Sequence, residues 1–523
     1  MRTLSSTLSA AQKTLTFSPL YKIVLTYGAA STTYDQTRIL SIDHMESESS
    51  QTLEVVLHNA DKAITQDYRG YKCVLSIGMT TSAGDEYSAY APLWVTSQQN
   101  YSGRGSLTVT LSLKGLPDLL AADKANARYA LESADANTVK DLLTAIVRAT
   151  LPPFSHCKAY TATFDSEDAL IDVFRPADSF IINLNDTRMD VIQQLLQYTQ
   201  CVMRAEDDGE LHFFVPAVDG RTWAVSTAYS VNDYVQPTSP NNNFTYKCTV
   251  AGTSAATEPT WPTTAGNTVA DGTVTWTAVG FAYEYKVAVA DTHEIFSKST
   301  RKRLLIPNYI VVSSHPDSSD AYTGLAEDTD SSDLTDMEKR EHYYLRVTSN
   351  AQCATLARSI LAKYQTEAQK GSAAVPINVG QEVYDYIKFT DRRQDDVRIG
   401  NVAYVQTVIK SGTWVTYIAF GKVGAGGLLG LSPLVSQGTA EIAKQAPFDK
   451  INKALDEIDQ ALTELYAAFN RLVDYVNAQI QTIYANNVQA TERLKIPVGT
   501  DKYGYGGANT TIDTLTFALG VGS

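Results

Sequence analysis

The sequence predicts a mainly β protein with α+β parts: two β-barrel domains, a small inserted β module and a C-terminal coiled coil. Three observations predict this fold class. Apolar residues alternate with polar ones at the period of a strand over much of the chain, whereas a few segments have the period of a helix. The 523 residues exceed what one hydrophobic core usually serves. The segment 221–281 differs from both neighbours, being rich in Thr, Gly, Pro and Asn.

Residues 1–120 are predicted to form the first β-barrel domain. Four runs between residues 18 and 116 alternate apolar and polar residues, so each run offers one face to a core. Turn signals such as Asn59-Ala60-Asp61 and Gly84-Asp85 separate the runs. The apolar positions are Tyr21, Ile23, Leu25 and Tyr27, then Leu53, Val55 and Leu57, then Cys73, Leu75 and Ile77, then Leu107, Val109, Leu111 and Leu113.

Residues 121–222 are predicted to form an α+β domain. A helix is expected behind Thr138 and Asp141, which have the spacing of a capping box, and a second helix after Asp186. The two strands of a hairpin are expected at 201–205 and 211–215. The turn between them contains Asp208-Gly209, a residue pair that tight turns favour.

Residues 223–281 are predicted to form the inserted β module. Aromatic rings can stack on the apolar faces of sugars, and the module is dense in them. The alternative is that so small a domain needs its aromatic residues as a core. Both roles can coexist in one module. The candidate carbohydrate-binding residues are Trp223, Tyr229, Tyr246, Trp261 and Trp276.

Residues 282–430 are predicted to contain the second β-barrel. Strands are expected at 283–290, 304–313, 382–390, 398–409 and 414–420, with a helix from Ser349 to about Lys370. The acidic, Ser-rich stretch 316–341 is predicted to be a mobile, solvated loop. Its Asp residues lack the central Gly and closing Glu of a calcium loop. The Gly-rich run 421–430 is predicted to be a hinge.

Residues 431–523 are predicted to contain a linker, a coiled-coil helix and a tip segment. A single apolar stripe repeats in steps of four and three, which is typical of a coiled-coil seam. Self-association would bury this stripe; packing of the helix on its own barrel is the alternative. The predicted interface residues are Ile451, Leu455, Ile458, Leu462, Leu465, Phe469, Leu472, Val476, Ile480 and Ile483.

Composition and motifs exclude several classes of function. A formal net charge of −14 disfavours a protein that grips nucleic acid, which needs clustered Lys and Arg. The five Cys and seven His are scattered without the spacing of metal ligands, so no metal and no cofactor is predicted. No signal peptide or membrane span is expected. No catalytic motif is found. Asp207, Asp208 and Glu210 are the nearest carboxylate cluster, and a turn role is the alternative to a glycosidase pair.

The inserted module resembles small carbohydrate-binding-type modules that recur in phage tail proteins and in some bacterial glycan-processing enzymes. The resemblance indicates a module of this type more than it indicates a ligand. The residues that carry it are Trp223, Tyr229, Asp233, Val235, Tyr246, Cys248, the run 252–254, Glu258-Pro259, Trp261-Pro262 and the run 271–276.

The rest of the chain resembles the baseplate-hub or tail-tip family of long-tailed bacteriophages. The resemblance rests on the runs 53–59, 70–77 and 191–209 and on the late strands that end at Phe420-Gly421. It implies two barrels per chain related to the tail-tube fold, and a homotrimer whose six barrels mate with tail-tube or distal tail ring proteins. Other tail-tip or fibre proteins would be further partners, and DNA would pass without being specifically bound. The location would be the virion tail tip, assembled in the host bacterial cytoplasm.

The chain departs from some members of that family because it has no recognisable wall-degrading insertion. The inserted module would instead contact a host surface glycan. Two alternatives remain: a glycan-degrading tail-tip enzyme whose carboxylates meet only on folding, and a receptor-binding tail fibre, in which long repetitive β segments would be expected.

Overall fold

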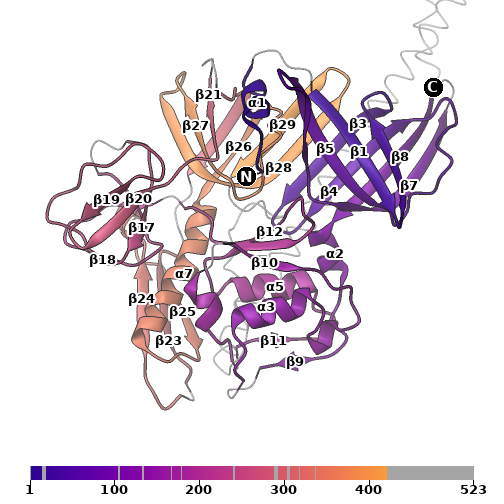
Figure 1. The fold of residues 1–523 in the computed structure, drawn as a ribbon. Helices are drawn as coiled ribbons and strands as arrows, with labels where there is room; N and C mark the ends of the chain where they lie inside the picture. Colours follow the sequence, from indigo (N-terminus) through magenta and orange to yellow (C-terminus); the bar gives the residue numbers. More distant parts are fainter. Residues whose placement is uncertain are drawn as a thin grey trace, which may run out of the picture. The chain divides into compact units, whose positions relative to one another are not determined.

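The computed structural model describes residues 2–420, apart from 15–18, 104–105, 132–134, 166–167, 178, 219, 239–241, 288–291, 303–306, 317 and 336. All described residues belong to one compact unit (Figure 1). The predicted hinge at 421–430 and the predicted coiled coil lie outside the described residues. The described chain is mainly β, as the sequence predicts.

The N-terminal β domain contains eight strands, four of which (β1, β4, β5 and β8) are the runs predicted from the alternating pattern, and a short helix, α1 (Ser6–Ala11). Inward residues such as Ile23, Val55 and Leu75 are fully buried in one core. The strands are hydrogen-bonded in the order β2-β1-β5-β7-β8-β4-β3. They are β1 (Pro19–Tyr27), β2 (Ala30–Asp35), β3 (Ile39–Ser47), β4 (Gln51–His58), β5 (Lys72–Thr81), β6 (Gly84–Ala89), β7 (Leu93–Gly103) and β8 (Ser106–Gly115).

The C-terminal β domain has its own core, which includes Tyr285, Ile387 and Phe389. Its strands are β21 (Tyr283–Lys286), β22 (Ser297–Lys302), β26 (Gln369–Pro376), β27 (Tyr386–Asp391), β28 (Asp396–Lys410) and β29 (Thr413–Phe420). Within the described residues, no pairing closes either β domain into a ring, and β2 and β22 end the main path of paired strands. By the strand pairing of the described residues, both predicted barrels are therefore open sheets.

One strand pair joins the two β domains. Strand β3 pairs antiparallel with β28, from Ser41 opposite Lys410 to Ser47 opposite Tyr404. The same stretch of β28 also pairs with β29, so it is hydrogen-bonded on both sides. The two domains therefore share one continuous sheet.

The hub domain is the α+β unit that follows β8. Helix α3 begins with the predicted capping box, in which Thr138 and Asp141 exchange hydrogen bonds. The predicted hairpin is confirmed, with Gly209 in its turn at φ 86°. The elements are α2 (Leu116–Ala122), β9 (Tyr129–Ala130), α3 (Val139–Val147), η1 (Pro152–Phe154), β10 (Ala162–Phe164), α4 (Ala169–Val173), β11 (Ile181–Ile182), α5 (Arg188–Leu196), β12 (Val202–Ala205) and β13 (Leu211–Phe214).

A later segment of the chain completes the core of the hub. Ile310, Tyr343 and Leu356 pack in the same cluster as the hub helices. The range 282–430 therefore contributes to three cores, since it also supplies the C-terminal β domain and adds Ile377, Val379 and Ile409 to the core of the N-terminal one. The elements are β23 (Tyr309–Ser314), β24 (Thr323–Glu327), α6 (Thr329–Thr335), β25 (Arg340–Leu345) and α7 (Asn350–Ala368), where α7 is the helix predicted after Ser349.

The prediction of a mobile, solvated loop at 316–341 is wrong for most of that stretch. It contains β24, α6 and the start of β25. Asp328 is buried, and its carboxylate accepts hydrogen bonds from Ser331 N at 2.9 Å and from Gln365 Nε2 at 2.8 Å. Asp330 accepts hydrogen bonds from the backbone N and the hydroxyl of Thr222. These two acidic side chains therefore attach the stretch to α7 and to Thr222 at the start of the inserted segment.

The inserted module has a core of its own. Its sheet has the order β14-β16-β17-β20-β19, and β15 pairs with β18 beside it. The strands are β14 (Arg221–Thr222), β15 (Ala228–Tyr229), β16 (Tyr234–Gln236), β17 (Tyr246–Val250), β18 (Gly252–Thr253), β19 (Thr268–Asp271) and β20 (Val274–Ala278).

Candidate functional site: a charged junction between the β domains and the hub

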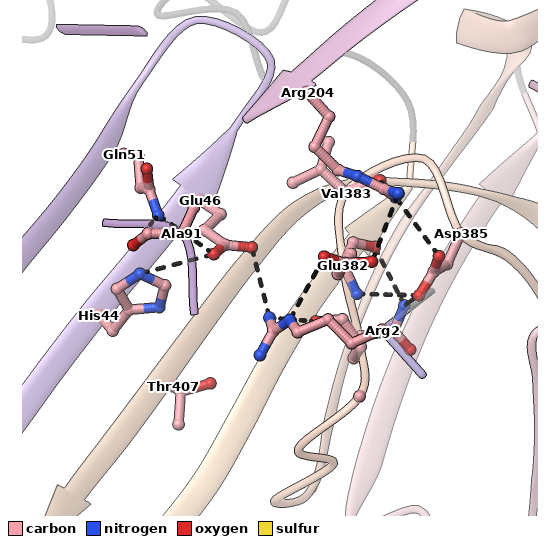
Figure 2. Close-up of polar contacts among 12 residues, drawn as sticks. Arg2, His44, Glu46, Gln51, Ala91, Arg204, Glu382, Val383, Asp385 and Thr407 are labelled. Atoms are coloured by element: carbon pink, nitrogen blue, oxygen red, sulfur yellow. Dashed lines mark hydrogen bonds and ion pairs between the residues drawn. The ribbon is translucent and has the colours of Figure 1, made fainter. Parts of the chain in front are cut away.

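A network of buried charged side chains lies where the two β domains meet the hub (Figure 2). Arg2 precedes α1, Glu46 is on β3, Arg204 is on β12, and Glu382 and Asp385 precede β27. Arg2 is 6 % exposed, Glu382 5 % and Asp385 4 %. Buried charges are costly unless they are paired and hydrogen-bonded, so the partners of these groups decide whether the junction is stable.

Arg2 is held by groups of both the C-terminal and the N-terminal β domain. Its Nε donates to Glu382 Oε1 at 3.3 Å. Its Nη1 and Nη2 donate to the backbone oxygens of Val379 at 3.0 Å and Gln381 at 2.9 Å. The guanidinium carbon lies 3.5 Å from the ring centroid of Tyr90, a cation–π contact. Arg2 therefore ties the start of the chain to the segment before β27.

Arg204 brings the hub into the same network. Its Nη2 lies 3.4 Å from Glu382 Oε2, its Nη1 lies 3.6 Å from Asp385 Oδ1, and it also pairs with Glu206. Glu382 thus faces one arginine with each carboxylate oxygen (Figure 2). Burial acts to raise the pKa of Glu382, but Arg2 and Arg204 outweigh it and the net pKa is lowered. Glu382 is therefore ionised at neutral pH and bridges two cations.

Glu46 and His44 place titratable groups on the N-terminal side of the junction. Glu46 Oε2 lies 3.8 Å from Arg2 Nη2, and Glu46 Oε1 accepts a hydrogen bond from Gln51 Nε2 at 3.4 Å. Burial raises the pKa of Glu46 to about 7, although Arg2 opposes the shift. Burial, aided by Arg2, lowers the pKa of the fully buried His44 to about 3. His44 is thus neutral at physiological pH, whereas Glu46 titrates there.

The cavity on the Glu46 and Arg204 side of the junction is too small to hold a substrate. It has a volume of about 20 Å³ and is lined by residues that include Glu46, Gln51, Arg204 and Val383. That volume holds about one water molecule. The charged groups are paired with each other, so this arrangement suits a structural role, which is to hold the domains in fixed relative positions.

Part of this network can be recognised from the spacing of residues in the sequence. Ile42, His44 and Glu46 are two residues apart, so they share one face of β3, and Ile42 and His44 are fully buried. Polar residues at inward positions of a strand therefore mark the junction. No comparable sequence pattern identifies Arg2 or Glu382, because their partners are distant in the sequence.

A second polar cluster surrounds His212 on β13. Its Nδ1 lies 2.9 Å from Asp165 Oδ2, and its Nε2 lies 2.9 Å from Asp208 Oδ2. Glu206 Oε2 is 3.9 Å from Nδ1. Burial acts to lower the pKa of His212, but the hydrogen bonds to the two Asp carboxylates outweigh it and the pKa is raised. The two carboxylates therefore favour the charged form of His212, which links the hairpin turn to the segment after β10.

Two sets of side chains around His212 are close enough to share a metal ion. Asp165, Glu206 and His212 form one set, and Asp208, Glu210 and His212 form the other, with ligand atoms within 4.8 Å of one another. Both nitrogens of His212 are occupied by carboxylates, so hydrogen bonding and ion pairing account for the cluster.

Two of the three carboxylates in the hairpin turn, Asp208 and Glu210, make hydrogen bonds within the fold. Asp208 Oδ1 accepts a hydrogen bond from the backbone N of Glu210 at 2.8 Å, as expected in a tight turn. Its other oxygen faces His212. Glu210 accepts a hydrogen bond from the hydroxyl of Thr163.

Most of the predicted sugar-binding residues lie in the core of the inserted module. Tyr246 and Trp276 are fully buried, Tyr229 is 3 % exposed and Trp223 is 8 % exposed. Asp271 Oδ2 accepts hydrogen bonds from both indole groups, Trp223 Nε1 at 2.8 Å and Trp276 Nε1 at 2.9 Å. These rings present no open face, so their placement matches the alternative that the module uses them as a core.

Trp261 differs from the other four candidates. It is partly exposed, and one side of its ring packs on Tyr246 with a centroid distance of 4.3 Å. Its Nε1 donates to Glu258 Oε1 at 2.8 Å. The ring is therefore held in place at the edge of the core.

The ten predicted interface residues, Ile451 to Ile483, lie outside the described residues. None of the described helices combines the length and apolar character needed to cross a membrane. All five cysteines are free, and four of them are buried.

No protein-family model and no curated protein sequence matches this chain. Among solved structures, it is similar to a tail protein from Neisseria meningitidis, with a TM-score of 0.46 and 11 % identity over 77 % of this chain and 97 % of that one. It is also similar to a 43 kDa tail protein of a Shewanella oneidensis prophage, with a TM-score of 0.40 and 10 % identity over 77 % and 98 % of the two chains. A third is an E. coli component of the type VI secretion system, with a TM-score of 0.38 and 10 % identity over 77 % and 76 %. The first two are described as tail proteins, and the third as similar in structure to tail proteins of bacteriophage T4.

Proposed function

We propose that this chain is a structural subunit of a phage or phage-like tail tip, a baseplate-hub protein. The observation that carries the proposal is the β3–β28 pairing, which makes one sheet of two β domains and is backed by the buried junction. A subunit built in this way presents two β domains in a fixed register. A ring of repeated barrels requires the two β domains of each chain to have such a fixed relative position.

The free edges of the sheet support assembly with neighbours. Unpaired edge strands expose backbone N–H and C=O groups, and pairing with another chain satisfies them. The main path of strand pairs ends at β2 and β22. We propose that three chains pair through such edges and form six barrels that close the end of the tail tube. Tail-tube or distal ring proteins would bind one side, and other tail-tip or fibre proteins the other.

The C-terminal helix would hold the trimer together. Its predicted apolar stripe needs a partner, and three copies packed around one axis supply it. The virion tail tip would be the location, with assembly in the host bacterial cytoplasm. The net charge of −14 supports a channel that DNA passes without binding, because like charges repel.

The mass of the protein in solution tests the trimer. Light scattering after size-exclusion chromatography is expected to give three times the 57.1 kDa of the chain. Leu462→Asp places a charge in the predicted stripe and is expected to yield monomers. Thr463→Asp, next to the stripe, serves as the control and should remain trimeric. A native protein that stays monomeric at high concentration would contradict the proposal.

Adhesion to a host surface glycan is a further part of the proposed function, and Trp261 is the candidate that supports it. A partly exposed ring held by Tyr246 and Glu258 can stack on a sugar without further ordering. Binding of the protein to host cell-wall and capsular polysaccharide is expected to fall with Trp261→Ala. Trp414→Ala, at an exposed tryptophan in the C-terminal β domain, should leave it unchanged. Equal binding by both variants would remove Trp261 from the proposal.

A further inference from the structure

Residues 2–14 form a strap that contacts both β domains. The strap contains α1 and leads to β1 (Figure 1). In its middle, Leu8 is 2 % exposed and packs in the core of the N-terminal β domain. The Thr7 hydroxyl donates to Glu86 Oε2 of β6 at 2.7 Å. The middle of the strap is therefore fixed to the N-terminal β domain.

Both ends of the strap bind the segment between β26 and β27. At one end, the backbone N of Arg2 donates to Gly380 O at 3.3 Å. Its guanidinium donates to the backbone oxygens of Val379 and Gln381. At the other end, the buried Gln12 accepts a hydrogen bond from Val379 N with its Oε1 at 3.1 Å. The strap thus bonds both backbone groups of Val379, one with each end.

The segment under the strap inserts into the neighbouring domain. Ile377 and Val379 follow β26 of the C-terminal β domain, yet they lie in the core of the N-terminal one and are 1 % and 0 % exposed. The strap lies close against this segment, because a Cβ atom added to Gly380 would be 2.9 Å from Leu4 Cδ1. The insertion is thus a second connection between the β domains, besides the pairing of β3 with β28, and the strap lies over it.

Few contacts hold the strap in place. A helix of six residues is too short to be stable by itself, so α1 depends on its contacts with the rest of the chain. Of the strap residues, Arg2, Leu8 and Gln12 are buried, and Leu8 is the one apolar side chain among them. Gln12 Nε2 has no hydrogen-bond partner within the described part of the chain, which costs free energy. A segment with so few buried apolar contacts opens more readily than the strands beneath it.

We propose that the strap is a conformational device that controls movement between the two β domains. Closed, it retains Ile377 and Val379 in the core of the N-terminal domain, and the two domains form one rigid body. Detached, it leaves the backbone N–H and C=O of Val379 without their partners in the strap, so the inserted segment becomes free to withdraw. The domains then move about the pairing of β3 with β28. The device lies within one chain and is independent of the proposed trimer.

Hydrogen exchange of full-chain variants tests whether the strap is held in this way. Leu8→Ala combined with Gln12→Ala removes the buried anchor of the strap and its bond to Val379, while the charged junction around Glu382 keeps its residues. Exchange of α1 is expected to become about tenfold faster or more, since a large buried side chain is lost. Protection of α3 and α5 in the hub should be unchanged, which shows that the chain remains folded. Thr3→Ala, at an exposed strap residue, is the control and should exchange as the wild type does.

The distance between the β domains is measured with spin labels at Thr33→Cys and Gln394→Cys, two exposed positions in different domains. Cys157→Ser removes the one cysteine that is not buried. The labelled wild type and Thr3→Ala are expected to give one narrow distance distribution, and the strap variant a broader one. An unchanged distribution in the strap variant, once α1 exchanges faster, would overturn the proposal, and so would unchanged exchange of α1. Neither result would bear on the trimer, which the mass in solution tests separately.

Discussion

Glu382 faces Arg2 with one carboxylate oxygen and Arg204 with the other. The two arginines come from the start of the chain and from the hub, so one side chain neutralises cations from two domains. Removing one partner of a buried ion pair leaves an uncompensated charge, which costs about 3–5 kcal/mol. Glu382 is therefore the residue of the junction whose loss is expected to reduce its stability most.

We expect Glu382→Gln to lower the free energy of unfolding by about 3 kcal/mol or more, because Arg2 and Arg204 lose their shared counter-ion. Chemical denaturation measures this change. Glu54→Gln, on the exposed face of β4, is the control and should change stability by less than about 0.5 kcal/mol. Equal stability of the two variants would mean that Asp385 and Glu46 suffice for both arginines.

His212 makes stability depend on pH. Its pKa is raised in the folded state, so its stabilisation is complete below the unfolded pKa and is lost as pH rises through the folded pKa. We expect the melting temperature to fall as the pH is raised from about 6 through neutrality, where unperturbed histidine titrates. His212→Gln should flatten that part of the profile. An unchanged profile would show that the imidazolium contributes nothing to the fold.

Glu46 contributes to the pH profile with the same sign. Its raised pKa of about 7 means that ionisation is less favourable in the folded state, so stability falls as pH rises from its unfolded pKa through about 7. His212→Gln leaves this contribution in place. A variant that combines His212→Gln with Glu46→Gln should lose both contributions. Its pH profile, compared with that of His212→Gln alone, separates the contribution of Glu46 from that of His212.

Only some of these residues could be found from the sequence. His44 and Glu46 interrupt an apolar face of β3, and the carboxylates beside Gly209 stand out as a cluster. Arg2, Arg204 and Glu382 look like ordinary surface charges, because burial depends on which distant strands surround them. The aromatic residues of the inserted module were found, but composition does not distinguish a ring in the core from a ring at the surface.

At the scale of elements, α7 lies close against β24. A Cβ atom added to Gly324 would lie 2.2 Å from the backbone N of Ala354 and 2.6 Å from the backbone C of Cys353. Backbone atoms of a helix move only with the whole helix. The glycine is therefore required by the close approach of the two elements.

We expect Gly324→Ala to destabilise the protein by about 1–3 kcal/mol, the usual cost of overpacking. Increased hydrogen exchange in α7 would locate the effect. Leu325→Ala, at a residue of the same strand that is 54 % exposed, is the control and should be nearly neutral. An unchanged exchange rate in α7 would mean that the helix is not held by this contact.

Elements with local signals were predicted well. The capping box at Thr138 and the Asp-Gly turn before β13 depend on neighbours in the sequence. The stretch 316–341 was not predicted, because its structure depends on remote partners. Asp328 is fixed by Gln365 of α7, and Asp330 by Thr222 of the inserted module.

At the scale of the molecule, the pairing of β3 with β28 predicts that the two β domains lose structure together. Thr407 lies opposite His44 on one side and Thr416 on the other. Thr407→Pro removes a backbone N–H and breaks the ladder. We expect hydrogen exchange to increase in both β3 and β28, while β17 and β20 keep their protection. Thr407→Val is the matched control. Increased exchange in β28 alone would show that the domains are independent.

The order of the strands could not be predicted from the sequence. Alternation identifies strands, but it does not say that residues 41–47 and 404–410 are neighbours in one sheet. The hub core is a similar case, since it combines helices before the inserted module with strands and a helix after it.

A shared sheet has a mechanical consequence. Since β3 and β28 are hydrogen-bonded neighbours, a force on one β domain is passed to the other through a row of backbone hydrogen bonds and through the contacts of Arg2 with Glu46 and Glu382. Each chain would then rotate as one rigid body. A tail tip built from such chains would open at the interfaces between subunits, while every subunit keeps its own geometry.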